Sequence, residues 1–221
     1  MDELWTVARK QIEIAEERID EKGIVQDSDV LGWCFLDWSL ELNKQAGAQG
    51  VLLYAIKNAI RIAEVLELQD EIEVLEKKHT RYRDAARKFL WDENRGLFIS
   101  GVQHQISYAS QIWMILGGAV NSEEASGILH RIKEADDSVG MVTPYMYHHY
   151  VQANIEAGQY EEAIKILKAY WGGMADMGAD TFWELYNPEN PSESPYGGTI
   201  VNSYCHAWSC APAYFLRKYV S

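Results

Sequence analysis

Apolar residues recur at helical spacing along most of this chain. One stripe runs from Leu4 to Ile19 and stops at Gly23, and two more cover about 52–66 and 72–89. The i, i+3, i+4, i+7 spacing returns over about 106–119, 122–135, 143–157, 160–176 and 203–219. The pattern therefore predicts eight helices, joined in pairs by short turns as α-hairpins. Only "GLFISG", residues 96–101, is β-like, and it predicts a small ribbon or loop.

Two long segments break this helical pattern. Residues 22–45 and 178–202 each exceed 20 residues, and both carry Trp and acidic side chains. Structureless stretches of this length inside a compact domain are typical of functional loops. We find no sequence repeat of fixed period, which argues against an armadillo or tetratricopeptide array.

The charge balance narrows the range of partners. The chain has 221 residues, 48% of them apolar, so it is long and apolar enough for a folded domain. Its formal net charge is −13, and such a surface repels nucleic-acid phosphates and anionic lipid. We therefore expect no nucleic-acid partner and no membrane partner, whereas a neutral ligand is compatible with this charge.

Targeting signals and cysteines narrow the localisation and the chemistry of the chain only slightly. No apolar run is long enough to span a membrane, and the N-terminus has no signal-peptide core. If the chain is the whole gene product, we expect it in the cytoplasm; if it is cut from a longer protein, that expectation fails. Cys34, Cys205 and Cys210 are an odd number without C-x-x-C spacing, and we interpret them as buried reduced thiols.

Glu184 is the first candidate for chemistry, because it directly follows Thr181, Phe182 and Trp183. An aromatic setting takes a carboxylate partly out of water, which shifts its protonation toward the range useful for acid–base work. Alternatively, Glu184 caps the following turn or faces water. The residues alone leave both interpretations open.

Histidines give a second candidate. Ser203 or Asn202 can cap a helix, which would place His206 in its first turn, pointing into a pocket; the alternative is a structural histidine. The neighbours His148 and His149 would point about 100° apart on a helix, so they cannot bind one metal together. We interpret them as structural or rim residues, and we predict neither a metal site nor a cofactor.

The segment "GWCFLDWSLELNK" contains Trp33, Asp37 and Trp38. Trp rings stack on the apolar faces of sugars, and carboxylates accept hydrogen bonds from sugar hydroxyls. Core packing explains most aromatic residues in any protein, but several Trp here fall at loop–helix junctions, which favours a sugar-lined cleft. No Gly-rich phosphate loop, Ser–His–Asp signature or H-E-x-x-H motif is present.

Three stretches, residues 35–66, 143–186 and 202–216, resemble the catalytic domain of bacterial α-L-rhamnosidase-like glycoside hydrolases of the six-hairpin type. The most specific features are a hairpin ending in "GADTFWE" and the later "SYCHAW" before a last helix. The likeness runs from about residue 30 to the end. It implies an all-α fold, a toroid of paired helices called the (α/α)6 barrel, with residues 1–221 as one domain and the site where helix ends converge.

The resemblance also implies roles for individual residues. Glu184 corresponds to the general base that activates water in an inverting hydrolysis, and His206 to a histidine that binds the sugar. Asp37, Trp38 and Trp183 correspond to residues that line the sugar site. The implied partner is a carbohydrate substrate, an α-L-rhamnoside or a related glycoside.

The chain departs from the family pattern in two ways. A complete barrel needs about twelve helices, whereas the pattern here predicts eight. The family's general acid lies in a more N-terminal acidic motif, and "QDSDVLGW", with Asp27 and Asp29, does not match it. We therefore expect an incomplete barrel whose open faces are closed by N-terminal hairpins missing here, or by a second copy of the chain.

Three hypotheses remain. The chain is a glycoside hydrolase domain, a carbohydrate-binding remnant without activity, or a helical scaffold whose aromatic residues only pack a core. The scaffold predicts that Glu184 and His206 lie apart and face solvent. The other two predict that both share one cleft with Trp183 and Trp38, and turnover distinguishes between them.

Overall fold

The computed structural model describes residues 2–27 and 34–220, so Asp29 and Trp33 lie outside the described residues. The described chain is mainly helical, with one small ribbon. In order, its elements are α1 (Asp2–Glu16), α3 (Gln45–Val65), α4 (Gln69–Phe89), β1 (Trp91–Asp92), β2 (Leu97–Phe98), α5 (Tyr108–Leu116), α6 (Ser122–Lys133), α7 (Pro144–Glu156), α8 (Tyr160–Asp176), the 3₁₀ turns η1 (Thr199–Val201) and η2 (Ala207–Ser209), and α9 (Ala211–Tyr219).

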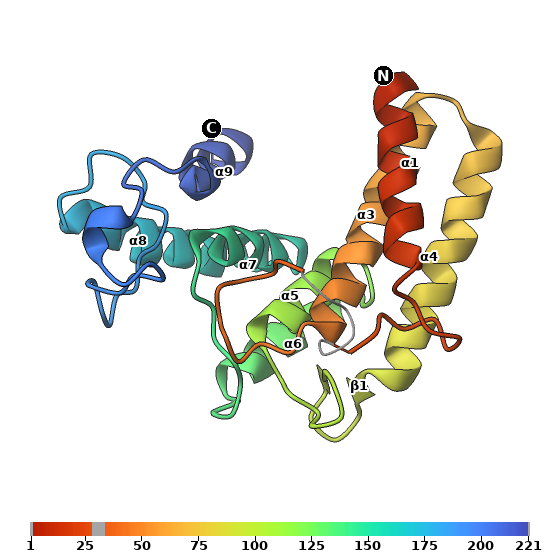
Figure 1. Cartoon of the computed structure of the whole chain (residues 1–221), viewed down its shortest axis with the longest axis horizontal. Helices are drawn as coiled ribbons and strands as arrows, with labels where there is room; N and C mark the ends of the chain where they lie inside the picture. The colour runs from red at the N-terminus through yellow and green to blue at the C-terminus, as the bar shows by residue number, and fades with distance from the viewer. Residues whose placement is uncertain (1, 28–33, 221) are drawn as a thin grey trace.

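The helices pair as the apolar pattern predicts. Helix α3 packs on α4, α5 on α6, and α7 on α8, and α5 also contacts both α3 and α7. Helix α5 is buried along nearly its whole length, so α3, α5 and α7 form an inner row. Figure 1 shows α1, α3 and α4 on one flank, α7, α8 and α9 on the other, and α5 and α6 between them. The predicted all-α fold of paired helical hairpins is confirmed.

The inner row is close because glycines stand where α3 crosses α5. A Cβ atom on Gly50 would lie 2.4 Å from the carbonyl carbon of Trp113 and 2.6 Å from the amide nitrogen of Met114. No side chain fits such a space, because real Cβ atoms do not approach backbone atoms so closely. Gly50 therefore sets the distance between the two helices.

Polar side chains define where the helices begin. Ser107 accepts a hydrogen bond from the N–H of Ser110 at the start of α5. Asn121 and Glu124 form a reciprocal capping box on α6, and Thr143 caps α7 directly before Pro144. These caps explain why the predicted starts of the middle helices agree with the structure to within about two residues, whereas α5 ends three residues before its predicted end.

The predicted ribbon is present as a short antiparallel pair, β1 with β2. Phe98 is completely buried, and its backbone N–H and C=O are both bound by the side chain of Gln111. The amide of Gln111 thus takes the place of a third strand. This arrangement fixes the ribbon to α5.

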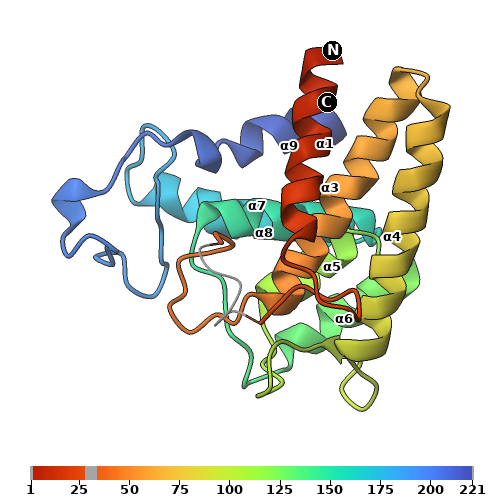
Figure 2. The same ribbon diagram turned by 45° about the vertical axis from the view of Figure 1, so that its right-hand side comes forward.

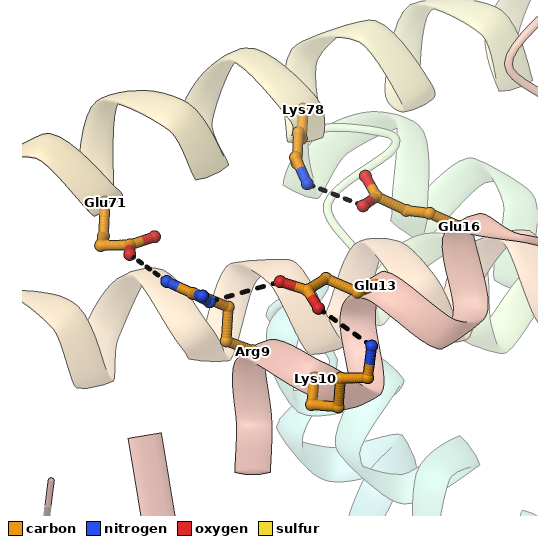
Figure 3. Close-up of polar contacts among 6 residues, drawn as sticks. All are labelled: Arg9, Lys10, Glu13, Glu16, Glu71 and Lys78. Atoms are coloured by element: carbon orange, nitrogen blue, oxygen red, sulfur yellow. Dashed lines mark hydrogen bonds and ion pairs between the residues drawn. The ribbon is translucent and has the colours of Figure 1, made fainter. Parts of the chain in front are cut away.

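Helix α1 lies on α3 and is joined to α4 by ion pairs (Figure 3). Arg9 donates to Glu71 at 2.8 Å, and Lys78 donates to Glu16 at 2.7 Å. Exposed pairs of this kind contribute only about 0–1 kcal/mol each. The buried side chains of Trp5 and Ile12 therefore hold α1 more strongly than its charges do.

The last helix begins later than predicted. The pattern predicts a helix over 203–219, whereas α9 begins at Ala211, with Pro212 in its first turn. Residues 203–206 are not helical, because their backbone groups bond to residues 182–184 instead. In the described ranges, no helix is both long and apolar enough to cross a membrane.

Candidate functional site

The candidate site is built where residues 181–184 run alongside residues 203–206 in the opposite direction. The N–H of Glu184 donates to the carbonyl of Ser203 at 2.8 Å, and the N–H of His206 donates to the carbonyl of Phe182 at 2.9 Å. The hydroxyl of Thr181 also donates to the carbonyl of Tyr204. This pairing brings together two parts of the chain that lie about twenty residues apart in sequence.

Glu184 lies at the centre of this pairing and is only 7% exposed. Its Oε2 accepts a hydrogen bond from the N–H of Ser203 at 2.8 Å, and its Oε1 accepts one from the hydroxyl of Tyr196 at 2.7 Å. The indole of Trp208 donates to the backbone carbonyl of Glu184 at 2.9 Å. The carboxylate is therefore held by a donor on each of its oxygens.

His206 lies beside Glu184, as the hydrolase and remnant hypotheses require. Its Nε2 is 3.8 Å from Oε1 of Glu184. Its Nδ1 accepts the N–H of Trp208 at 3.4 Å, so in the neutral ring Nε2 carries the proton and faces the carboxylate. The prediction that His206 lies in a helix's first turn is wrong in detail, because it precedes the short turn η2 as its N-cap.

Five aromatic side chains form a connected group beside these two residues, and we call them the aromatic cluster. Trp38 lies edge-on to Trp208 at 5.1 Å between ring centres and edge-on to Tyr196 at 5.9 Å. The ring of Trp208 stacks on Phe35 at 5.9 Å and contacts His206 at 4.5 Å. The aromatic cluster consists of Phe35, Trp38, Tyr145, Tyr196 and Trp208.

The side chain of Trp183 points away from the side chain of Glu184. Its described ring contacts are with Tyr204 at 5.4 Å and Tyr186 at 6.1 Å, not with the aromatic cluster. Adjacent residues of an extended segment point to opposite faces, which explains the separation. As a sugar contact, Trp183 stays a prediction.

Asp37 is buried and is bound to the protein's own backbone. Its carboxylate accepts the N–H groups of Val142 at 2.7 Å, Thr143 at 3.0 Å and Trp38 at 2.9 Å. Burial raises the pKa of Asp37, and these amides counter the shift in part. The contacts tie residues 34–38 to the start of α7, which positions Trp38. As a direct sugar ligand, Asp37 stays a prediction.

Sequence reasoning did not select four members of the aromatic cluster: Phe35, Tyr145, Tyr196 and Trp208. Trp208 had a signal, since it ends the same "SYCHAW" segment that contains His206. Phe35 lies two residues before Asp37, in the quoted aromatic segment. Nothing in the loop around Tyr196 marks it out, because its contact with Glu184 spans twelve residues of irregular chain.

None of the remaining histidines and cysteines has a described side-chain contact with Glu184 or His206. His149 packs against Trp113 at 4.2 Å, and burial lowers its pKa to about 3, which agrees with a structural role. All three cysteines are free, but the interpretation as buried thiols is wrong for Cys205 and Cys210, which are exposed. In the described part of the chain, no group of three His, Cys, Asp or Glu side chains is placed to hold a metal.

Comparison with known proteins identifies relatives. The profile of the bacterial α-L-rhamnosidase six-hairpin glycosidase domain matches residues 1–220. A rhamnosidase from Klebsiella oxytoca, solved with rhamnose bound, is 45% identical over 99% of this chain, with a TM-score of 0.92. A GH78 family rhamnosidase of Bacillus sp. GL1 shares the fold at 23% identity over 98% of the chain, with a TM-score of 0.82.

The relatives are longer proteins. This chain spans 42% of the length of the Klebsiella oxytoca rhamnosidase chain and 23% of the Bacillus one. No curated protein sequence matches it.

Proposed function

This chain belongs to the family of six-hairpin glycosidase domains of bacterial α-L-rhamnosidases, and we propose that it takes part in the inverting hydrolysis of α-L-rhamnosides or related glycosides. One observation carries the proposal: the carboxylate of Glu184, with His206 3.8 Å away, lies beside an aromatic cluster. The same contact argues against the scaffold hypothesis, which needs Glu184 and His206 to lie apart in solvent.

In the proposed reaction Glu184 is the general base. An inverting glycosidase uses one carboxylate to take a proton from water while an acid on the opposite face protonates the leaving oxygen, with the two carboxyl groups about 6.5–9.5 Å apart. Glu184 is suited to the first role because Tyr196 and Ser203 each donate to one of its oxygens and so fix the orientation of its carboxyl group. The Nε2–H of His206 is placed to bind a sugar hydroxyl or the attacking water near Oε1.

The aromatic cluster supplies the surface for the sugar. Trp38 and Trp208 are each partly exposed, and their rings meet at 66°. The partly exposed face of either ring can stack on an apolar face of a pyranose. Asp37 contributes indirectly, because its bonds to the start of α7 hold Trp38 in place.

The residues named for the proposed site do not include a general acid. We propose where the segment that supplies it would lie. An apolar groove of about 700 Å³ lies between α1 and α3, lined by residues that include Ile12, Val51 and Ile62. Its lining also includes Phe35 and Tyr145 of the aromatic cluster. We propose that a helix of further barrel hairpins covers this groove and brings the acid to the site.

The experiment is hydrolysis of an aryl α-L-rhamnoside with a good leaving group, which needs little help from an acid. Glu184→Gln keeps the shape of the side chain but cannot accept a proton, so we expect turnover to fall by about 10³-fold while rhamnose binding stays. Glu161→Gln, the same change at an exposed position on α8, is the matched control. Sedimentation of the assayed sample gives the mass of the active species.

The outcomes separate the hypotheses. Turnover of Glu184→Gln equal to that of the wild type contradicts the assignment of the base. No turnover in any folded variant favours the carbohydrate-binding remnant, and titration with L-rhamnose then decides whether the aromatic cluster binds a sugar. An active species larger than one chain indicates that a second copy, rather than further hairpins, covers the groove.

A further inference from the structure

Tyr196 connects an exposed loop to the buried carboxylate of Glu184. Its side chain is attached to an exposed loop, and the residue is 53% exposed, yet its hydroxyl reaches the buried Oε1 of Glu184. The loop is folded back by its own hydrogen bonds, with the hydroxyl of Ser194 bound to Asn202 at 2.7 Å and to the carbonyl of Gly198 at 2.9 Å. These bonds place Tyr196 over the carboxylate.

We infer that Tyr196 is a positioning residue for Glu184: its hydroxyl fixes Oε1, and with the Ser203 N–H on Oε2 it sets the plane of the carboxylate. The inference rests on the proposed function, in which Glu184 is the base. An ionised carboxylate only accepts hydrogen bonds and has about four acceptor sites. Each oxygen of Glu184 therefore keeps capacity for a water molecule beside the donor that holds it.

In the hydrogen bond between Tyr196 and Glu184, the tyrosine hydroxyl is the donor. The bond to Glu184 raises the pKa of Tyr196, so the phenol stays protonated and donates throughout the neutral range. A donor to the charged form of a carboxylate favours that form. Removal of the hydroxyl therefore makes Glu184 easier to protonate, and the acid limb of activity moves to higher pH.

Tyr196 also connects the carboxylate to the proposed sugar surface. Its ring lies edge-on to Trp38, at 5.9 Å and 78°. Trp38 itself is fixed through its neighbour Asp37 to the start of α7. A Phe at position 196 keeps this ring contact, so the substitution removes only the hydroxyl.

Other titratable groups lie near Glu184 and are the same in the wild type and in Tyr196→Phe. His206 faces Oε1 at 3.8 Å and is unchanged in the variant. Asp37, on the neighbouring segment, is bound to backbone amides, and Tyr204 packs edge-on to Trp183. A change seen in Tyr196→Phe alone is therefore assigned to the lost hydroxyl.

The first measurement is the pH profile of aryl α-L-rhamnoside hydrolysis by the wild type, Tyr196→Phe and Tyr160→Phe. Tyr160 is a control because it is 57% exposed at the start of α8. For Tyr196→Phe we expect kcat to fall about 10-fold, KM to change less than about twofold, and the acid limb to move up by about one pH unit. An unchanged profile beside a normal melting curve would overturn the inference.

The second measurement does not depend on turnover. Proteins labelled with ¹³C at the glutamate carboxyl are titrated by NMR, and the signal missing from Glu184→Gln identifies Glu184. A midpoint about one pH unit higher in Tyr196→Phe supports the inference even if the wild type hydrolyses nothing, in which case the proposed function fails alone. Equal midpoints in the two proteins overturn it.

Discussion

The helical arc (residues 45–176) and the site segment (residues 177–210) are stabilised in different ways. In the arc, buried apolar side chains such as Leu53, Ile112 and Leu129 recur at helical spacing. In the site segment, the described structure is mostly irregular, and hydrogen bonds join residues 181–184 to 203–208. The arc therefore depends mainly on burial of local, periodic surface, whereas the site depends on a few pairings between distant residues.

This difference predicts that the two regions respond to different kinds of substitution. A change of volume in the arc should lower the stability of the whole chain, because helices α3 to α7 share one core. Loss of a single polar contact near the site should act locally. The following predictions test that contrast.

The largest effect is expected for Gly50→Ala. The added methyl would lie 2.4 Å from the backbone of Trp113, and backbone atoms cannot move aside as a flexible side chain can. Although Ala favours a helix over Gly by about 1 kcal/mol, we expect the clash to lower the free energy of unfolding by about 3 kcal/mol. Denaturant unfolding followed by circular dichroism measures this.

Gly172→Ala is the matched control, because Gly172 is also helical but a Cβ there meets no atom within 4 Å. Here we expect only the helix-propensity gain, up to about 1 kcal/mol of added stability. If both substitutions changed stability by the same amount, the close approach of α3 and α5 would not be what fixes the arc.

The same contrast explains how much the sequence could predict. The periodic stripes gave the helices of the arc, because a buried helical face needs apolar residues three and four apart. Caps such as Thr143 with Pro144 then limited the error at their ends. The helix predicted over 203–219 failed at its start, because the backbone of residues 203–206 is paired with distant residues that no local pattern reveals.

The candidate site was predictable only in part. The residues alone made Glu184 and His206 candidates with alternatives left open, and the resemblance implied their roles; the structure places them 3.8 Å apart. Tyr196 could not be found in this way, because its hydrogen bond depends on the fold of an irregular loop. Asp37 was selected for a carboxylate's affinity for sugars, whereas it accepts hydrogen bonds from the backbone N–H groups of Val142, Thr143 and Trp38.

A smaller effect is expected for Asp37→Ala, which acts where the two regions join. The substitution leaves the buried N–H groups of Val142 and Thr143 without their acceptor. We expect about 2 kcal/mol of lost stability, since an unsatisfied buried donor costs about 1–3 kcal/mol. Burial raises the pKa of Asp37, which shows that its charge is costly there and keeps the net loss near this middle value.

Hydrogen exchange locates the effect of Asp37→Ala. The amides of Val142 and Thr143 should exchange faster, and amides in α4 should not, with exposed Asp136→Ala as the control. Uniformly faster exchange over the whole arc would show that Asp37 supports the global fold rather than the position of Trp38.

The effect that is smallest near neutral pH is expected at His149 on α7, where the arc contacts the aromatic cluster through Tyr145. Its ring packs between Trp113 and Tyr145, and burial lowers its pKa to about 3 from an ordinary value near 6.5. Below about pH 6.5 His149 binds a proton in the unfolded chain but not in the folded chain. The free energy of unfolding therefore falls by about 1.4 kcal/mol for each unit that the pH drops, down to about pH 3.

Phe cannot be protonated, so the difference in stability between His149→Phe and the wild type should grow in favour of the variant from pH 6 to pH 4. Burial also lowers the pKa of neighbouring His148, and His148 lowers that of His149 further, so the difference between the two proteins includes this coupling. Urea unfolding at four pH values, with His130→Phe on the exposed face of α6 as the matched control, measures the slope. A difference that stays constant from pH 6 to pH 4 would mean that the imidazole of His149 reaches water in the folded protein, and that the junction of the two regions is less closely packed than the arc.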